Sequence, residues 1–159
     1  MNKQLIALSL LGLFASGTVL ASDTSTLTVK GTLIRPPCTL TSNTVLTANF
    51  GSLRYDQVST AAQIDIPVTL TCPPNSVIDI NVSAFSTVSD TVAATSKTNL
   101  GYSLLWKSDS SLVNIKGTSL NLTGLNGTVD LSMKAKLVVL GALSEGDFSA
   151  TAGIHIVYR

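Results

Sequence analysis

The feature that most constrains the fold is a two-residue alternation of apolar and polar side chains that recurs along the chain. In AQIDIPVTLTC, residues 62–72, Ile64 and Ile66 share one parity with later apolar residues, while Asp65 takes the other. The same pattern returns in residues 76–84, 127–141 and 147–159. Antiparallel strands with one face in a core and one in water show this alternation. The sequence therefore predicts an all-β protein.

Short segments rich in turn-forming residues separate these strands: CPPNS, KSDSS, TGLNGT and LSEGD. Weaker strands are expected over residues 45–50, 101–107 and 112–115. Strands at this spacing predict a two-sheet sandwich of immunoglobulin-like kind. In the last patterned segment the apolar parity comprises Phe148, Ala150, Ala152, Ile154, Ile156 and Tyr158.

The N-terminal segment, residues 1–21, is predicted to be a signal peptide. Lys3 gives a positive start, an apolar stretch follows, and Val19 and Ala21 place small residues at a cleavage site. A transmembrane anchor is the alternative, but the apolar part is short and no stop-transfer charges follow it. Cleavage after Ala21 leaves a chain long enough for one domain, without direct membrane insertion.

Export decides how the two cysteines are interpreted. Cys38 and Cys72 both lie in the exported part, and an even pair in an oxidising compartment predicts a disulfide. Closing that loop would stabilise the fold by roughly 4 kcal/mol. A zinc site or a redox pair is the weaker alternative, because the chain has a single histidine and no CxxC spacing.

Charge and residue pattern argue against nucleic-acid binding and catalysis. Without the signal peptide the chain has nine basic and nine acidic residues, and no basic cluster is present to neutralise phosphates. His155 has the polar parity of its strand, and no acidic pair or phosphate-binding glycine loop is found. We expect no enzyme activity, no cofactor and no metal site. Trp106 could stack on a sugar, although such aromatics more often pack against a sheet.

The segment before Cys38 raises a separate question. In STLTVKGTLIRPPCTL, residues 25–40, one parity carries Leu27, Val29, Gly31 and Leu33, and Arg35-Pro36-Pro37 follows. Proline donates no ladder hydrogen bond and favours an extended, stiff backbone. The segment is therefore either a first strand with a sharp corner or a strand that pairs outside its own domain.

The run TLTVKGTLIRPPC resembles the N-terminal extension of type 1-like pilin subunits assembled by the chaperone–usher pathway. The likeness continues in TANFGSLRY, IDIPVTLTCPPNSVIDINVSA and EGDFSATAGIHIVYR, and so covers nearly all of the exported chain. Two departures are the proline pair, where one proline is commoner, and Arg35, which continues the inward parity. The plugs are therefore expected to end at Leu33.

The resemblance implies an incomplete immunoglobulin-like β-sandwich that lacks its last strand. Residues 22–37 would be a donor-strand extension and residues 38–159 the pilin domain. The extension would fill the groove of a neighbouring subunit with Leu27, Val29, Gly31 and Leu33. The subunit's own acceptor groove would be lined by Ala152, Ile154, Ile156 and Tyr158 of its C-terminal strand.

The implied partners are a periplasmic pilus chaperone, an outer-membrane usher and adjacent fimbrial subunits. The implied location is a fimbrium on the surface of a Gram-negative bacterium, where the subunit would support cell adhesion. A minor or adaptor subunit is the favoured role, and a small major subunit comes second. A tip adhesin is not expected, because the exported chain leaves no room for a second, lectin-type domain.

A competing interpretation is a self-contained secreted β-sandwich that binds a glycan or small ligand. In that case residues 27–34 would be its own first strand and Trp106 its contact residue.

Overall fold

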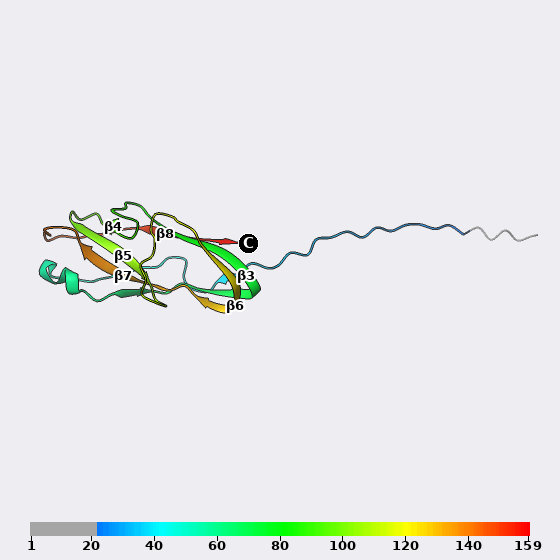
Figure 1. The fold of residues 1–159 in the computed structure, drawn as a ribbon, viewed down its shortest axis with the longest axis horizontal. Coiled ribbons are helices and arrows are strands. Elements are labelled where there is room, and N and C mark those ends of the chain that lie inside the picture. The colour runs from blue at the N-terminus through cyan, green and yellow to red at the C-terminus, as the bar shows by residue number, and fades with distance from the viewer. Residues whose placement is uncertain (1–21) are drawn as a thin grey trace, which may run out of the picture. The chain divides into compact units, whose positions relative to one another are not determined.

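The computed structural model describes residues 22–159, so the predicted signal peptide lies outside the described part of the chain. The chain divides into two units, Met1–Leu33 and Ile34–Arg159. Residues 22–33 form neither helix nor strand. The second unit is built of strands and one short 3-10 helix, η1 (Tyr55–Thr60) (Figure 1).

The strands form two antiparallel four-stranded sheets. The first sheet contains β1 (Thr39–Leu40), β3 (Thr69–Ala84), β6 (Leu120–Asp130) and β8 (Ala152–Tyr158). The long strand β3 is central and pairs with each of the other three. The second sheet has the order β2 (Ile64–Ile66), β7 (Met133–Val139), β5 (Leu100–Trp106) and β4 (Ala93–Ala94). The predicted all-β, immunoglobulin-like sandwich is confirmed.

The chain passes between the two sheets at two neighbouring points. Pro67 and Val68 connect β2 to β3, and Leu131 and Ser132 connect β6 to β7. The Val68 N–H donates to Ser132 Oγ at 3.1 Å, and the Leu131 N–H donates to the Val68 carbonyl at 2.8 Å. Residues 127–141, predicted as one alternating strand, are therefore divided between β6 and β7. The inward parity of Val129, Leu131 and Met133 continues through the crossing.

Two segments predicted as turns are instead parts of strands. CPPNS lies inside β3 and TGLNGT lies inside β6, and the register between these strands shifts around Ser76. Asn75, Gly124 and Gly127 all have positive φ, at 60°, 67° and 66°. These residues absorb the bulges of a long two-stranded ribbon, so the turn-forming residues bend paired strands without ending them.

Two of the three weaker strands were also predicted wrongly. Residues 101–107 correspond to β5, but residues 45–50 and 112–115 are not strands. Residues 112–115 bond to three separate parts of the chain. The Val113 N–H donates to the Leu104 carbonyl, the Ile115 N–H donates to the Asp90 carbonyl, and the Ile115 carbonyl accepts from the Ala84 N–H. Residues 45–50 form no backbone hydrogen bond with any other described residue.

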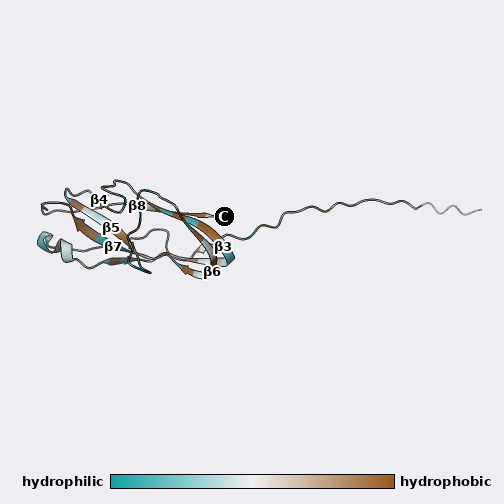
Figure 2. Cartoon of the chain, in the orientation of Figure 1, coloured by the Kyte–Doolittle hydropathy of each residue, from teal (hydrophilic) through white to brown (hydrophobic). Residues whose placement is uncertain are grey.

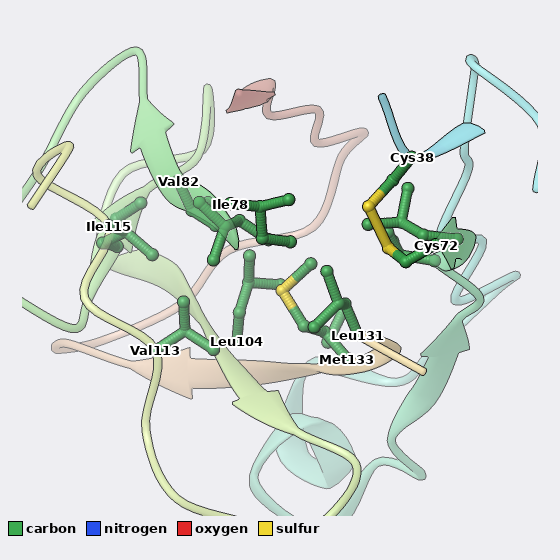
Figure 3. Packing of buried hydrophobic residues seen from close by; sticks show 14 residues of the cluster. Cys38, Cys72, Ile78, Val82, Leu104, Val113, Ile115, Leu131 and Met133 are labelled. Carbon is green, nitrogen blue, oxygen red and sulfur yellow. A yellow bond between two sulfur atoms is a disulfide. The ribbon is translucent and has the colours of Figure 1, made fainter. Parts of the chain in front are cut away.

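The core lies between the two sheets and is made of the alternating apolar residues (Figure 3). Buried side chains come from both sheets and from the connecting segment around Ile115, and include Leu70, Ile78, Ile80, Val82, Leu104, Val113, Ile115 and Met133. Figure 2 shows the resulting hydrophobic stretches along β3, β7 and β8. The predicted disulfide is confirmed: Cys38 and Cys72 are bonded and buried at one end of this core.

Candidate binding groove

A groove runs along β8, at the edge of the first sheet. β8 pairs with β3 on one side only. Residues 42–50 form the other wall, and two cavities of about 430 Å³ and about 310 Å³ lie between the walls. Leu46, Ala152 and Ile154 line both cavities, so the two are neighbouring parts of one groove.

The backbone of β8 has one satisfied edge and one open edge. The Arg159 N–H donates to the Val77 carbonyl at 3.0 Å, and the Phe85 N–H donates to the Thr151 carbonyl at 3.2 Å. Odd-numbered residues thus direct their backbone groups toward β3 and the residue that follows it. Because these groups alternate in an antiparallel ladder, even-numbered residues direct theirs toward the groove. The open edge of β8 therefore offers the N–H and C=O groups of Ala152, Ile154, Ile156 and Tyr158.

The facing wall alternates like a strand but is not paired. The side chains of Leu46, Ala48 and Phe50 are half-buried against the core, whereas Val45, Thr47 and Asn49 are exposed. Among the described residues, 43–53 take part in no backbone–backbone hydrogen bond. Both walls consequently combine apolar side chains with unpaired backbone N–H and C=O groups. An added strand recognises a surface of this kind.

The four predicted acceptor residues do not all lie in the groove. Ala152, Ile154 and Ile156 are half-buried and line it. Tyr158, 38% exposed, is paired with Ile78 at the end of β8 and lines neither cavity.

The floor and the second wall were not predicted as groove residues from the sequence. The floor comes from the second sheet through Tyr102, Leu104, Ala135 and Leu137. Their shared inward parity on β5 and β7 places them in the core, but only the open edge of β8 turns part of that core into a groove. The alternation at Leu46, Ala48 and Phe50 was the available signal for the second wall.

The predicted donor residues are exposed. Leu27 and Val29 are 86% and 85% exposed, Leu33 is fully exposed, and none belongs to a strand. Three large apolar side chains of one parity are thus exposed along this segment. Their role as a donor strand remains a prediction.

A polar cluster holds the end of β8 on the outer face of the first sheet. The Asp79 carboxylate of β3 accepts a hydrogen bond from Asn121 Nδ2 of β6 at 2.6 Å and another from the guanidinium of Arg159. These contacts lower the pKa of the Asp79 carboxyl below its ordinary value of 3.8, Asn121 first and Arg159 second. Three neighbouring chain segments are thus tied together where β8 ends.

A pH dependence follows from the lowered pKa of Asp79. A depressed folded-state pKa contributes stability that is present above pH 3.8 and is lost as the pH falls through the folded-state value. We expect Asp79→Asn to lower the thermal midpoint of unfolding at about pH 6, and the difference from wild type to shrink toward about pH 2. The control Asp65→Asn removes an exposed ion pair with Lys107 and should change little. A difference that is constant with pH would contradict this role.

Other candidate residues lie outside the groove. Trp106 is half-buried and borders a separate cavity of about 190 Å³ with Val113 and Leu120. His155 is exposed, as its parity predicts. Within residues 22–159 no three potential metal-ligating side chains come together. The same residues include no helix long and apolar enough to cross a membrane.

The fold and the groove define an immunoglobulin-like sandwich with an open edge strand. The chain belongs to the fimbrial protein family, whose family model matches residues 26–159. It is accordingly related to structural subunits of surface pili that contact other pilus subunits. A structural role fits the expectation that the chain is not an enzyme.

Solved structures with the same fold include pilus subunits. The P pilus rod subunit PapA is 17% identical with a TM-score of 0.65, over 78% of this chain and 100% of that one. A subunit from a chaperone–usher pilus, in a structure concerned with rod uncoiling, is 16% identical with a TM-score of 0.65, over 90% and 100%. The P pilus adaptor subunit PapF is 23% identical with a TM-score of 0.56, over 78% and 97%. Comparison with curated protein sequences gives no match.

Proposed function

We propose that this chain is a fimbrial subunit that polymerises by donor-strand exchange. The observation that carries the proposal is the groove, which has apolar side chains and unpaired backbone on both walls. A strand lying between β8 and residues 46–50 would form a ladder with each wall. Its inward side chains would cover the half-buried residues of both.

The donor would be the extension of a neighbouring subunit. Leu27, Val29 and Leu33 would enter the groove, Gly31 would lie where there is little room, and Lys30 would face water. Burial of the three large side chains would contribute roughly 5–9 kcal/mol before ordering costs. Each ladder hydrogen bond would add about 1 kcal/mol net.

Before assembly the groove needs a substitute strand. An open edge with apolar side chains beside it is a site of aggregation. A periplasmic chaperone would fill the groove with a strand of its own, and the donor extension would replace that strand at an outer-membrane usher. The route implies export through the periplasm of a Gram-negative bacterium into a fimbrium that supports cell adhesion.

The competing interpretation, a self-contained binding module, has less support. It requires residues 27–34 to be the first strand of their own sandwich, and these residues form no strand. The cavity beside Trp106 is also smaller than either part of the groove.

Cysteine trapping tests the proposal. Two variants are produced in the same cells, one with Val29→Cys in the extension and the other with Ile154→Cys or Ile156→Cys in β8. We expect oxidation of the fimbriae to give covalent dimers with at least one of the two acceptor variants. His155→Cys, which lies on the outward parity of the same strand, is the matched control and should give none. Fimbriae that assemble but give no dimer with either acceptor would contradict donor-strand exchange.

A further inference from the structure

The wall formed by β8 continues beyond the strand itself. β8 begins at Ala152, yet Phe148 and Ala150 keep the inward parity and line the larger cavity together with Ala152. Across the groove, Phe148 meets Phe50 with ring centroids 6.3 Å apart. The two walls are therefore in contact at this end, and the groove extends up to that contact.

Backbone hydrogen bonds show how residues before β8 are held. The Ser96 N–H donates to the Ser149 carbonyl at 2.8 Å, and the Ser149 N–H donates to Ser96 Oγ at 3.0 Å. The Thr151 carbonyl accepts from the Phe85 N–H at 3.2 Å and from the Tyr102 hydroxyl at 3.4 Å. Ser96 and Phe85 thus form backbone hydrogen bonds with residues 149 and 151, as β3 does with β8.

This backing leaves Ala150 facing the groove. The N–H and C=O of Ser149 are directed to Ser96, and the C=O of Thr151 is directed to Phe85. Because the backbone groups of successive residues in an extended chain point to alternate sides, the N–H and C=O of Ala150 are directed to the opposite side. Among the described residues neither group of Ala150 has a backbone partner. Ala150 lines the groove, as Ala152 and Ile154 do.

We propose that the acceptor edge extends one ladder step beyond β8, to Ala150, and that Ser96 is the positioning residue that preforms this step. The inference deepens the proposed function and rests on it. An occupying strand would bond to Ala150 as well as to the even-numbered residues of β8. Ser96 does not touch that strand; its hydroxyl and N–H hold Ser149 so that Ala150 is presented in extended form.

Hydrogen exchange of fimbriae purified from cells that produce the full chain tests this. Mass spectrometry with fragmentation that localises single amides would compare Ala150, at the added step, with Ile154, inside β8. We expect both amides to be protected in wild-type fimbriae. Protection of Ile154 with free exchange at Ala150 would overturn the inference and leave donor-strand exchange standing. Free exchange at both would contradict the proposed function itself.

Variants then separate positioning from general stability. Ser96→Ala removes one hydrogen bond to Ser149, which is expected to speed exchange at Ala150 about fivefold and to leave Ile156 unchanged. The matched control is Ser89→Ala, because Ser89 Oγ likewise accepts from a backbone N–H, that of Val92, at 3.1 Å. Ser89→Ala should alter neither amide. An unchanged Ala150, or equal acceleration at Ala150 and Ile156, would show that Ser96 does not position the edge. If Ser96→Ala chains do not assemble, the wild-type comparison still decides whether the edge reaches Ala150.

Discussion

Residues 22–159 with a second copy of residues 25–34 joined after Arg159 by an Asn-Gly turn are expected to fold as a soluble monomer. The same residues without the added segment are expected to aggregate unless a chaperone is present. β8 ends beside Arg159, so a two-residue turn returns the added segment along the open edge of β8. Size-exclusion chromatography and thermal unfolding of the two proteins measure the difference.

A matched control separates strand completion from a mere increase in length. The added segment with Leu27, Val29 and Leu33 all replaced by Ser keeps its length and turn but loses the side chains that would enter the groove. This control should behave like the chain without the segment. If all three proteins are equally soluble and unfold cooperatively, the chain is a self-contained domain.

Leu27→Asp combined with Val29→Asp is expected to prevent incorporation of the chain into fimbriae while leaving its own body intact. Each change removes about 1.5–3 kcal/mol of burial and would place a charge in an apolar groove. At about 1.4 kcal/mol per factor of ten, binding to a neighbour should weaken at least a hundredfold. Both residues are exposed in the chain itself, so its own core loses nothing. Counting surface fimbriae by electron microscopy, beside the amount of periplasmic protein, measures the effect.

The control for this variant uses the other parity of the same segment. Thr26→Asp with Thr28→Asp adds the same two charges at positions expected to face water, so fimbriae should form in nearly normal numbers. Equal loss with both pairs would indicate that charge, and not the inward parity, is responsible. Loss of the folded body in the Leu27 and Val29 variant would mean that the extension belongs to its own sandwich.

The strands of the core could be predicted because their alternation depends only on which face is buried. Ile78, Ile80 and Val82 are inward as expected, and so are Ala152, Ile154 and Ile156. The pairing of Cys38 with Cys72 followed from composition and export alone. Each of these features needs only local parity or a simple count.

The turn predictions failed where two segments with turn-forming residues lie opposite each other. Pro73 and Pro74 in β3 face the glycine-containing part of β6, and the two irregularities fit together as bulges. Each segment taken alone favours a turn because of its own residues. Its pairing partner lies far away along the sequence and does not enter a local prediction. Only long-range pairing decides between a bend in a ribbon and the end of a strand.

The strand prediction for residues 45–50 failed because a pairing partner is missing among the described residues. Leu46, Ala48 and Phe50 alternate as a strand would, and their side chains are half-buried against the core. The backbone forms no ladder because no strand of the described chain lies in the groove beside it. The proposed function gives this mismatch a cause: the pattern is that of a strand whose partner comes from another molecule.

An electron cryomicroscopy map of purified fimbriae would test most directly whether one subunit completes the sandwich of the next. Strand density should fill the space between β8 and residues 46–50. It should continue into the Cys38 of the adjacent subunit, with Leu27, Val29 and Leu33 directed into the groove. A groove that is empty, or that is filled by the extension of the same molecule, would contradict the account.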